Sequence, residues 1–219
     1  MNRRTTITVL SCTAIAGSLL AFLLLAVDWP PSNDAAIPEA VGESMAVEAQ
    51  KLGGSSGNFI VIARDTSTFK QPAADLALAS FLRAIRKGGG SISGLHSVEL
   101  DPLRPVQVPS GDYMELLHSA PPGSVVVSFM GPPILTEEQR GQLGALKTKV
   151  VAFCSGNIAG AGELRRLFDD GLVHSAVVAR YLLASSKSTL ASSGGFDSQY
   201  LVISQPSQLG GATTGGSQP

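Results

Sequence analysis

The chain has 219 residues, of which 44% are hydrophobic and 15% charged, with a formal net charge of −1 and two cysteines. That length leaves room for about one ordinary domain beside an N-terminal apolar segment. The near-neutral charge gives no global field that would favour nucleic acid. Cys12 and Cys154 lie too far apart in the sequence for a metal-binding motif, and they form no disulfide framework if the first lies in lipid.

An uncharged apolar run occupies residues 7–27, directly after Arg3 and Arg4. In a helix that rises about 1.5 Å per residue, this run matches the ~30 Å hydrocarbon core of a bilayer. The first basic residue after it is Lys51, so the positive-inside rule places residues 1–6 in the cytoplasm and the rest of the chain outside. We therefore expect a single-pass membrane protein with an uncleaved signal anchor and a periplasmic domain.

Two other interpretations of the apolar run compete with the anchor. A cleaved signal peptide has a shorter apolar core, of about 7–15 residues, and a small-residue cleavage site that Leu24-Leu25-Ala26 matches poorly. A lipoprotein would be processed before Cys12, but only a few apolar residues precede that cysteine.

The segments on either side of the expected domain have the composition of linkers. Residues 28–57 are rich in Pro, Ala, Ser, Gly and Glu, and 41–52 favours a short helix within them. We expect a flexible spacer over 28–57 and a disordered tail over 206–219, where almost no apolar residue is present to offset chain entropy. The folded domain should then span 58–205.

Within 58–205, short and nearly continuous apolar runs alternate with helical patterns. Continuous apolarity indicates strands that are covered on both faces, as in a parallel sheet between helices. Strands are expected at 59–63, 93–100, 125–130, 150–154, 176–179 and 200–203. Helices are expected at 72–87, 111–119, 136–147 and 161–170, with Ser110 capping the second and a Thr136–Gln139 capping box opening the third. This order predicts an α/β fold, a three-layer α/β/α sandwich around a doubly wound, mostly parallel sheet.

The candidate ligand-binding residues follow from that topology, because ligands of doubly wound sheets bind beyond the carboxyl ends of the strands. The loops expected there carry Arg64, Asp65, Thr66, Ser67, Ser155, Asn157 and Arg180. Charged and hydroxyl groups after the first strand suit a sugar or a carboxylate. The same groups are equally suited to cap the next helix and to pair with one another.

No strong catalytic motif is present. The sequence lacks a P-loop, a dinucleotide-binding glycine motif after the first strand, a G-x-S-x-G elbow between a strand and the helix that follows it, and an H-E-x-x-H zinc motif. Cys154-Ser155-Gly156-Asn157 follows a strand and resembles a nucleophile elbow loosely, but a cysteine nucleophile needs a nearby histidine, and only His174 is a candidate. We therefore assign no catalytic residue, no metal ligand and no cofactor.

A strand at 125–130, a proline-containing loop, a helix and a second strand at Lys149-Val150-Val151-Ala152-Phe153 follow one another in the segment 122–180. This pattern resembles part of a periplasmic sugar-binding-protein-like (type I) α/β lobe. The resemblance implies a doubly wound fold and a small polar ligand. Members of that family have two lobes around a cleft, whereas this chain has room for one, and the aspartate that often follows the second strand is replaced here by Cys154-Ser155-Gly156.

The sequence thus predicts a membrane-tethered extracytoplasmic module that binds a small polar ligand or an envelope protein partner without catalysis. The alternatives are a hydrolase or transferase that uses Cys154 or the Asp65 loop, and a structural subunit of a membrane complex. No nucleic-acid partner is expected.

Overall fold

The structure is a computed structural model that describes residue 18 and residues 33–99, 107–143, 146–156, 158, 160–183 and 195–209. The chain divides into Met1–Ala35 and a compact unit, Ala36–Pro219, which holds the sheet. No helix among the described residues is long and apolar enough to cross a membrane. The anchor expected at 7–27 lies, except for residue 18, outside the described residues.

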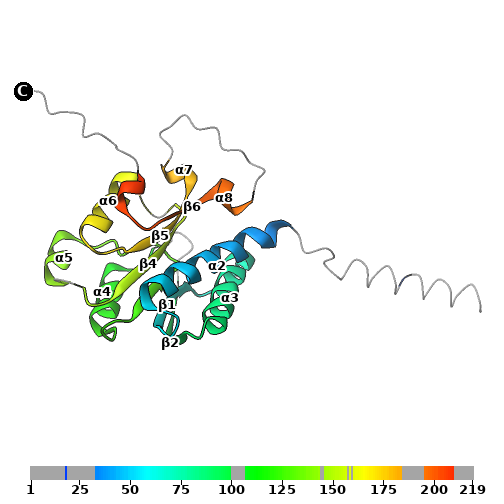
Figure 1. The fold of residues 1–219 in the computed structure, drawn as a ribbon, viewed down its shortest axis with the longest axis horizontal. Helices are drawn as coiled ribbons and strands as arrows, with labels where there is room; N and C mark the ends of the chain where they lie inside the picture. Colours follow the sequence, from blue (N-terminus) through cyan, green and yellow to red (C-terminus); the bar gives the residue numbers. More distant parts are fainter. Residues whose placement is uncertain are drawn as a thin grey trace, which may run out of the picture. The chain divides into compact units, whose positions relative to one another are not determined.

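The centre of the compact unit is a six-stranded sheet in the order β2-β1-β3-β4-β5-β6 (Figure 1). Its strands are β1 (Asn58–Arg64), β2 (Ser91–Val98), β3 (Val125–Ser128), β4 (Lys149–Cys154), β5 (Ser175–Ala179) and β6 (Tyr200–Ile203). All neighbouring strands are parallel except β5 and β6, which are antiparallel. The predicted mostly parallel sheet is therefore confirmed. The chain moves from β1 outward to β2 and then back to β3 on the other side of β1, so the strand order reverses between β1 and β3.

Helices cover both faces of this sheet. They are α2 (Asn33–Gly53), α3 (Pro72–Lys87), α4 (Ser110–Ser119), α5 (Glu137–Leu143), α6 (Ala161–Asp169), and the short α7 (Arg180–Leu183) and α8 (Phe196–Gln199). One buried cluster joins α2 and α3 to Val61, Val127 and Val151, whereas two others join α4 and α6 to the alternate residues of the strands. The three-layer arrangement is thus confirmed, because successive strand residues point to opposite faces.

The helix boundaries agree with the sequence in part. The predicted capping box at the start of α5 is confirmed, since Gln139 N–H donates to Thr136 Oγ1 (3.2 Å) and Thr136 N–H donates to Gln139 Oε1 (3.0 Å). This helix ends at Leu143, earlier than the 147 expected. Ser110 is not the cap of α4, because Pro109 holds that position and Ser110 Oγ accepts a hydrogen bond from Gln139 Nε2 (3.2 Å).

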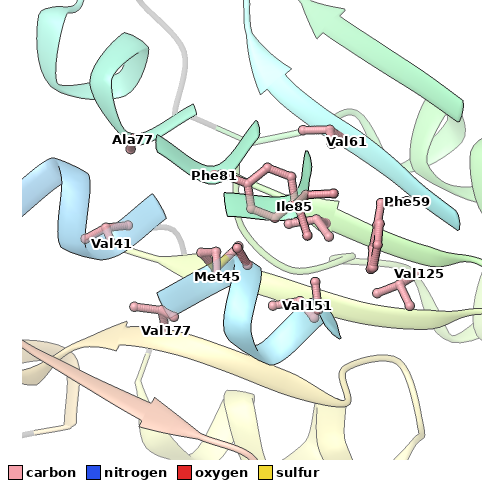
Figure 2. Close-up of a cluster of buried hydrophobic side chains, with 13 residues drawn as sticks. Val41, Met45, Phe59, Val61, Ala77, Phe81, Ile85, Val125, Val151 and Val177 are labelled. Carbon is pink, nitrogen blue, oxygen red and sulfur yellow. The ribbon is translucent and has the colours of Figure 1, made fainter. Parts of the chain in front are cut away.

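The expectation of a flexible spacer is wrong over Asn33–Gly53, which forms the long helix α2. Val41, Met45, Ala46 and Ala49 of this helix are buried. In Figure 2, Val41 and Met45 lie beside residues of the sheet in one apolar cluster. The physical reason is that, in the part of the chain that the structure describes, α3 is the one crossover helix in this cluster, and the face of β3, β4 and β5 needs a second helix to cover it.

The small residues that made α2 look like a linker are what allow it to approach its neighbour. A Cβ atom placed on Gly42 would lie 2.1 Å from the carbonyl oxygen of Ala77 in α3, so only glycine fits at this crossing. Polar contacts fix the other end of α2. Ser175 Oγ donates to the buried Glu48 Oε2 (2.8 Å), and Lys51 Nζ bonds to Glu48 Oε1 (2.6 Å).

The expected disordered tail is likewise wrong at its start. Pro206–Leu209 forms a short 3-10 helix, and Leu209 is buried in the cluster around α6. Gln208 Oε1 also accepts hydrogen bonds from the N–H groups of Ser204 (2.7 Å) and Gln205 (3.0 Å), so the start of the segment is held by packing and by local hydrogen bonds. The remainder of 206–219 lies outside the described residues.

Candidate functional site

A pocket of about 400 Å³ opens at the carboxyl ends of β1, β3 and β4. Arg64 lines it at the end of β1, Met130 lies two residues after β3, and Ser155 directly follows β4. This place includes the reversal of strand order between β1 and β3, where doubly wound sheets bind their ligands. The volume falls within the range of about 300–1,000 Å³ that is usual for small-molecule sites.

Helices α2 and α3 form apolar walls of the pocket. Ile37, Pro38 and Val41 line it from α2. The first turns of α3 contribute alanines, among them Ala74 and Ala77, whose short side chains leave the space that a larger residue would fill. The pocket therefore depends on the helix that the sequence analysis had assigned to a spacer.

Three aromatic side chains line the pocket, and each is held by a ring contact. Phe129 meets Phe81 edge to face, with ring centroids 5.5 Å apart. Phe153 and Tyr200 lie 5.6 Å apart, and Tyr200 stacks on Phe196 at the same distance. Such pairs contribute about 0.5–1.5 kcal/mol each beyond their burial, so the rings are pre-positioned to contact a ligand. Burial, with Tyr181 close by, raises the pKa of Tyr200, which keeps its phenol neutral.

Arg64 is the charged side chain among the pocket's described lining residues. It is half-buried, and its Nε is shielded from solvent without a hydrogen-bond partner. The ion pairs found among the described residues, Lys51–Glu48 and Arg140–Asp170, do not involve it. An unsatisfied buried donor costs about 1–3 kcal/mol, so the fold bears this cost at the pocket wall.

Asp65, Thr66 and Ser67 are not among the residues that line the pocket. Asp65 Oδ1 accepts a hydrogen bond from Ser67 N–H (2.8 Å), and this bond lowers the pKa of Asp65. Thr66 Oγ1 donates to Asp75 Oδ1 of α3 (2.6 Å). These contacts are local pairing, which the sequence allowed as part of the second interpretation of the loop, but neither caps α3, whose N-cap residue is Gln71.

The structure thus brings Arg64 and Ser155 together in one pocket, which Asp65, Thr66 and Ser67 do not line. Arg180 does not line it, and its Nε donates to the carbonyl oxygen of Asp197 (2.7 Å). Asn157 lies outside the described residues. The ligand-binding role of each of these residues stays a prediction.

Cys154 lacks the surroundings of a nucleophile. Its side chain is fully buried, and this burial raises the pKa of the thiol to about 12. His174 is no base for it, because His174 Nδ1 accepts a hydrogen bond from the N–H of Val150 (3.2 Å), near the opposite end of β4. The thiol is therefore protonated and shielded at neutral pH. Among the described residues no group of three or more His, Cys, Asp or Glu side chains is placed to hold a metal ion.

Sequence reasoning missed the apolar and aromatic part of the site. The signal that could have found the α2 wall is the four-residue spacing of Ile37, Val41, Met45 and Ala49, which puts them on one helix face. Phe129 directly follows β3 and Phe153 lies near the end of β4. At such positions the sequence pattern predicts side chains of the hydrophobic core, not the lining of a pocket.

No protein-family model matches this sequence, and no curated protein matches it. Solved structures do match it. An arabinose-binding protein from Geobacillus stearothermophilus has a TM-score of 0.52 and 16% identity, over 78% of this chain and 62% of its own. A solute-binding protein of an ABC transporter from Burkholderia graminis, in complex with D-arabinose, has a TM-score of 0.51 and 16% identity, over 78% and 60%. The sugar-binding protein of a sugar ABC transporter from Bacillus halodurans has a TM-score of 0.53 and 12% identity, over 78% and 63%.

These matches confirm, at the level of the fold, the resemblance to a periplasmic sugar-binding-protein lobe. The chain spans 60 to 63% of the length of these three proteins. At sequence identities of 12 to 16%, the similarity shows a shared fold only.

Proposed function

We propose that this protein is a membrane-tethered, extracytoplasmic binding module that holds a small ligand in the pocket at the carboxyl ends of β1, β3 and β4, without catalysis. The observation that carries the proposal is the position of that pocket. It lies at the strand-order reversal, and helices and aromatic rings with fixed neighbours line it. Proteins of the same fold include an arabinose-binding protein, which supports a small-molecule ligand.

The absence of catalysis in this proposal rests on the chemistry of the pocket. Its described lining includes one cation, Arg64, and no carboxylate, histidine or thiol. The hydroxyl groups of Ser155 and Tyr200 also line the pocket, but a serine nucleophile needs an adjacent base, and the raised pKa of Tyr200 disfavours loss of its proton. Cys154, the nucleophile of the alternative hypothesis, is fully buried with its pKa raised to about 12.

Membrane tethering is supported by the sequence. The apolar run at 7–27 is long enough to cross a bilayer, and Arg3 and Arg4 precede it. The same charge asymmetry supports a position of the domain outside the cytoplasm. Protease digestion of sealed, right-side-out membrane vesicles tests this placement, which is contradicted if the domain is protected until the vesicles are opened.

Ligand binding in the pocket is tested with a substitution that fills it. Ala74 lines the pocket on α3, whereas Ala79 lies on the exposed face of the same helix. The full chain in lipid nanodiscs is screened by thermal unfolding against sugars, amino acids and small organic acids. A bound ligand at 100 times its Kd stabilises the folded state by about 2.7 kcal/mol.

We expect at least one compound class to raise the melting temperature of the wild type and of Ala79→Trp, but not of Ala74→Trp. A stabilising compound that acts equally on all three proteins binds elsewhere and refutes the pocket as the site. A panel without any stabilising compound contradicts the proposed function itself.

A further inference from the structure

We infer that the ligand of this pocket is a small organic carboxylate with an aromatic or branched aliphatic body, and that Arg64 binds its carboxylate. The inference rests on the proposed function and adds the chemical class of the ligand. It differs from the sugars named for the proteins of similar fold, and the difference follows from the residues that line this pocket.

The first step is the charge of the pocket. Arg64 is the charged group in the described lining, and it has a buried Nε donor without a partner. The two nearest carboxylates along the chain are engaged elsewhere, Asp65 with Ser67 N–H and Asp75 with Thr66 Oγ1. A guanidinium group offers a planar fork of N–H donors that matches the two oxygens of a carboxylate. An anion in the pocket would therefore accept a hydrogen bond from Arg64 Nε and also neutralise the guanidinium charge.

The second step is the N-terminus of α3, which also faces the pocket. Gln71 at the N-cap position, Ala73 and Ala74 all line the cavity, and Gln71 makes no side-chain capping bond. The free N–H groups of a first helical turn carry partial positive charge, and they bind anions when no side chain caps them. Asp75, the acidic residue in this first turn, is not among the lining residues. Arg64 and the open turn of α3 thus present positive charge to the same cavity.

The third step concerns the body of the ligand. The α2 wall consists of Ile37, Pro38 and Val41, whose side chains have no hydrogen-bonding group. A sugar can lay one C–H face on an aromatic ring, but its hydroxyl groups surround the ring edge, and those that faced the α2 wall would be desolvated without a partner. An aromatic or branched aliphatic body instead fits against this wall and against the rings of Phe129 and Phe153. The pocket therefore suits a ligand with one anionic head and one apolar body.

The test compares acids with their neutral amides on the full chain in nanodiscs of zwitterionic lipid. The probes are 3-phenylpropionate and 4-methylpentanoate, each beside its amide, together with D-arabinose. The variants are Arg64→Gln, which removes the guanidinium, and Ala74→Trp, which fills the pocket. The matched control is Lys70→Gln, which removes the same charge from an exposed position in the loop before α3.

We expect at least one acid to bind the wild type about tenfold to a hundredfold more tightly than its amide, the range typical of a hydrogen bond to a charged group. This ratio of dissociation constants should fall to about one in Arg64→Gln, while Lys70→Gln keeps the wild-type ratio. Melting temperatures provide the folding control. Because the Arg64 Nε has no partner to lose, Arg64→Gln gives up only the packing of the longer side chain and should remain folded at the assay temperature.

Amides that bind as tightly as the acids, or an acid preference that survives in Arg64→Gln, overturn the inference. If D-arabinose binds, loses its affinity in Ala74→Trp, and neither acid binds, the proposed function stands and the carboxylate inference fails. If no probe binds, the inference also fails, whereas the proposed function is judged separately by the wider panel.

Discussion

The burial of Met45 gives the sharpest prediction about α2. Met45 is fully buried and shares a cluster with Val41, Val151 and Val177 (Figure 2). Replacing it by alanine removes these contacts and leaves a cavity, which for a buried methionine costs about 2–5 kcal/mol. In a protein of this size each kcal/mol lowers the melting temperature by about 2–4 °C, so a loss of about 3 kcal/mol corresponds to roughly 6–12 °C.

The measurement is thermal and urea unfolding of full-length Met45→Ala followed by circular dichroism at 222 nm. The matched control is Val47→Ala on the same helix, where the side chain is 49% exposed and the expected change is within about 0.5 kcal/mol. A flexible spacer would make the two substitutions equivalent. A free energy of unfolding for Met45→Ala that stays within 0.5 kcal/mol of the wild type would refute the packing of α2 on the sheet.

Three further predictions concern other parts of the fold. Gly42→Ala places a Cβ against the Ala77 carbonyl oxygen and should destabilise the domain by about 1–3 kcal/mol in urea unfolding. Cys154 should resist alkylation by iodoacetamide at pH 8 until the protein is denatured, because burial raises its pKa to about 12. Burial, with Lys149 near, lowers the pKa of His174 below its ordinary 6.5. The unfolded chain then binds this proton at higher pH than the folded one, so the stability contributed by neutral His174 should be lost as pH falls from 6.5 through the lowered pKa.

Each of these predictions has a control. Gly141→Ala, at a helical glycine whose added Cβ meets nothing, should be neutral or slightly stabilising. Alkylation is followed in a Cys12→Ser background, and rapid modification of the folded protein would show that the Cys154 thiol is accessible. His174→Gln should flatten the pH dependence of unfolding as the pH falls below 6.5. An unchanged dependence would mean that other groups cause it.

The sheet was predictable because its strands carry their own signal. Central strands covered on both faces become runs of Val, Ile and Ala, as in β3 and β5, and the glycines after α3 mark its end. The capping box of α5 is a similarly local signal, because two residues three positions apart bond to each other. Features of this kind need no knowledge of the tertiary structure.

The role of α2 could not be read in the same way, because its composition resembles a linker. Its buried positions include Ala46 and Ala49, and Gly42 is required by a contact with α3 that exists only in the folded state. The pocket was missed for the same reason. Topology placed Arg64 and Ser155 at the carboxyl edge of the sheet, where the pocket lies, but the α2 wall comes from a helix that precedes the expected domain.

Native mass spectrometry of the full chain, extracted from the membranes in which it is produced and released from its detergent in the spectrometer, tests the central claim most directly. We predict a small molecule of defined mass on the wild type and on Ala79→Trp, and its absence from Ala74→Trp. A wild-type chain with no added mass, or an added mass that persists in Ala74→Trp, would contradict ligand binding in the pocket at the carboxyl ends of β1, β3 and β4.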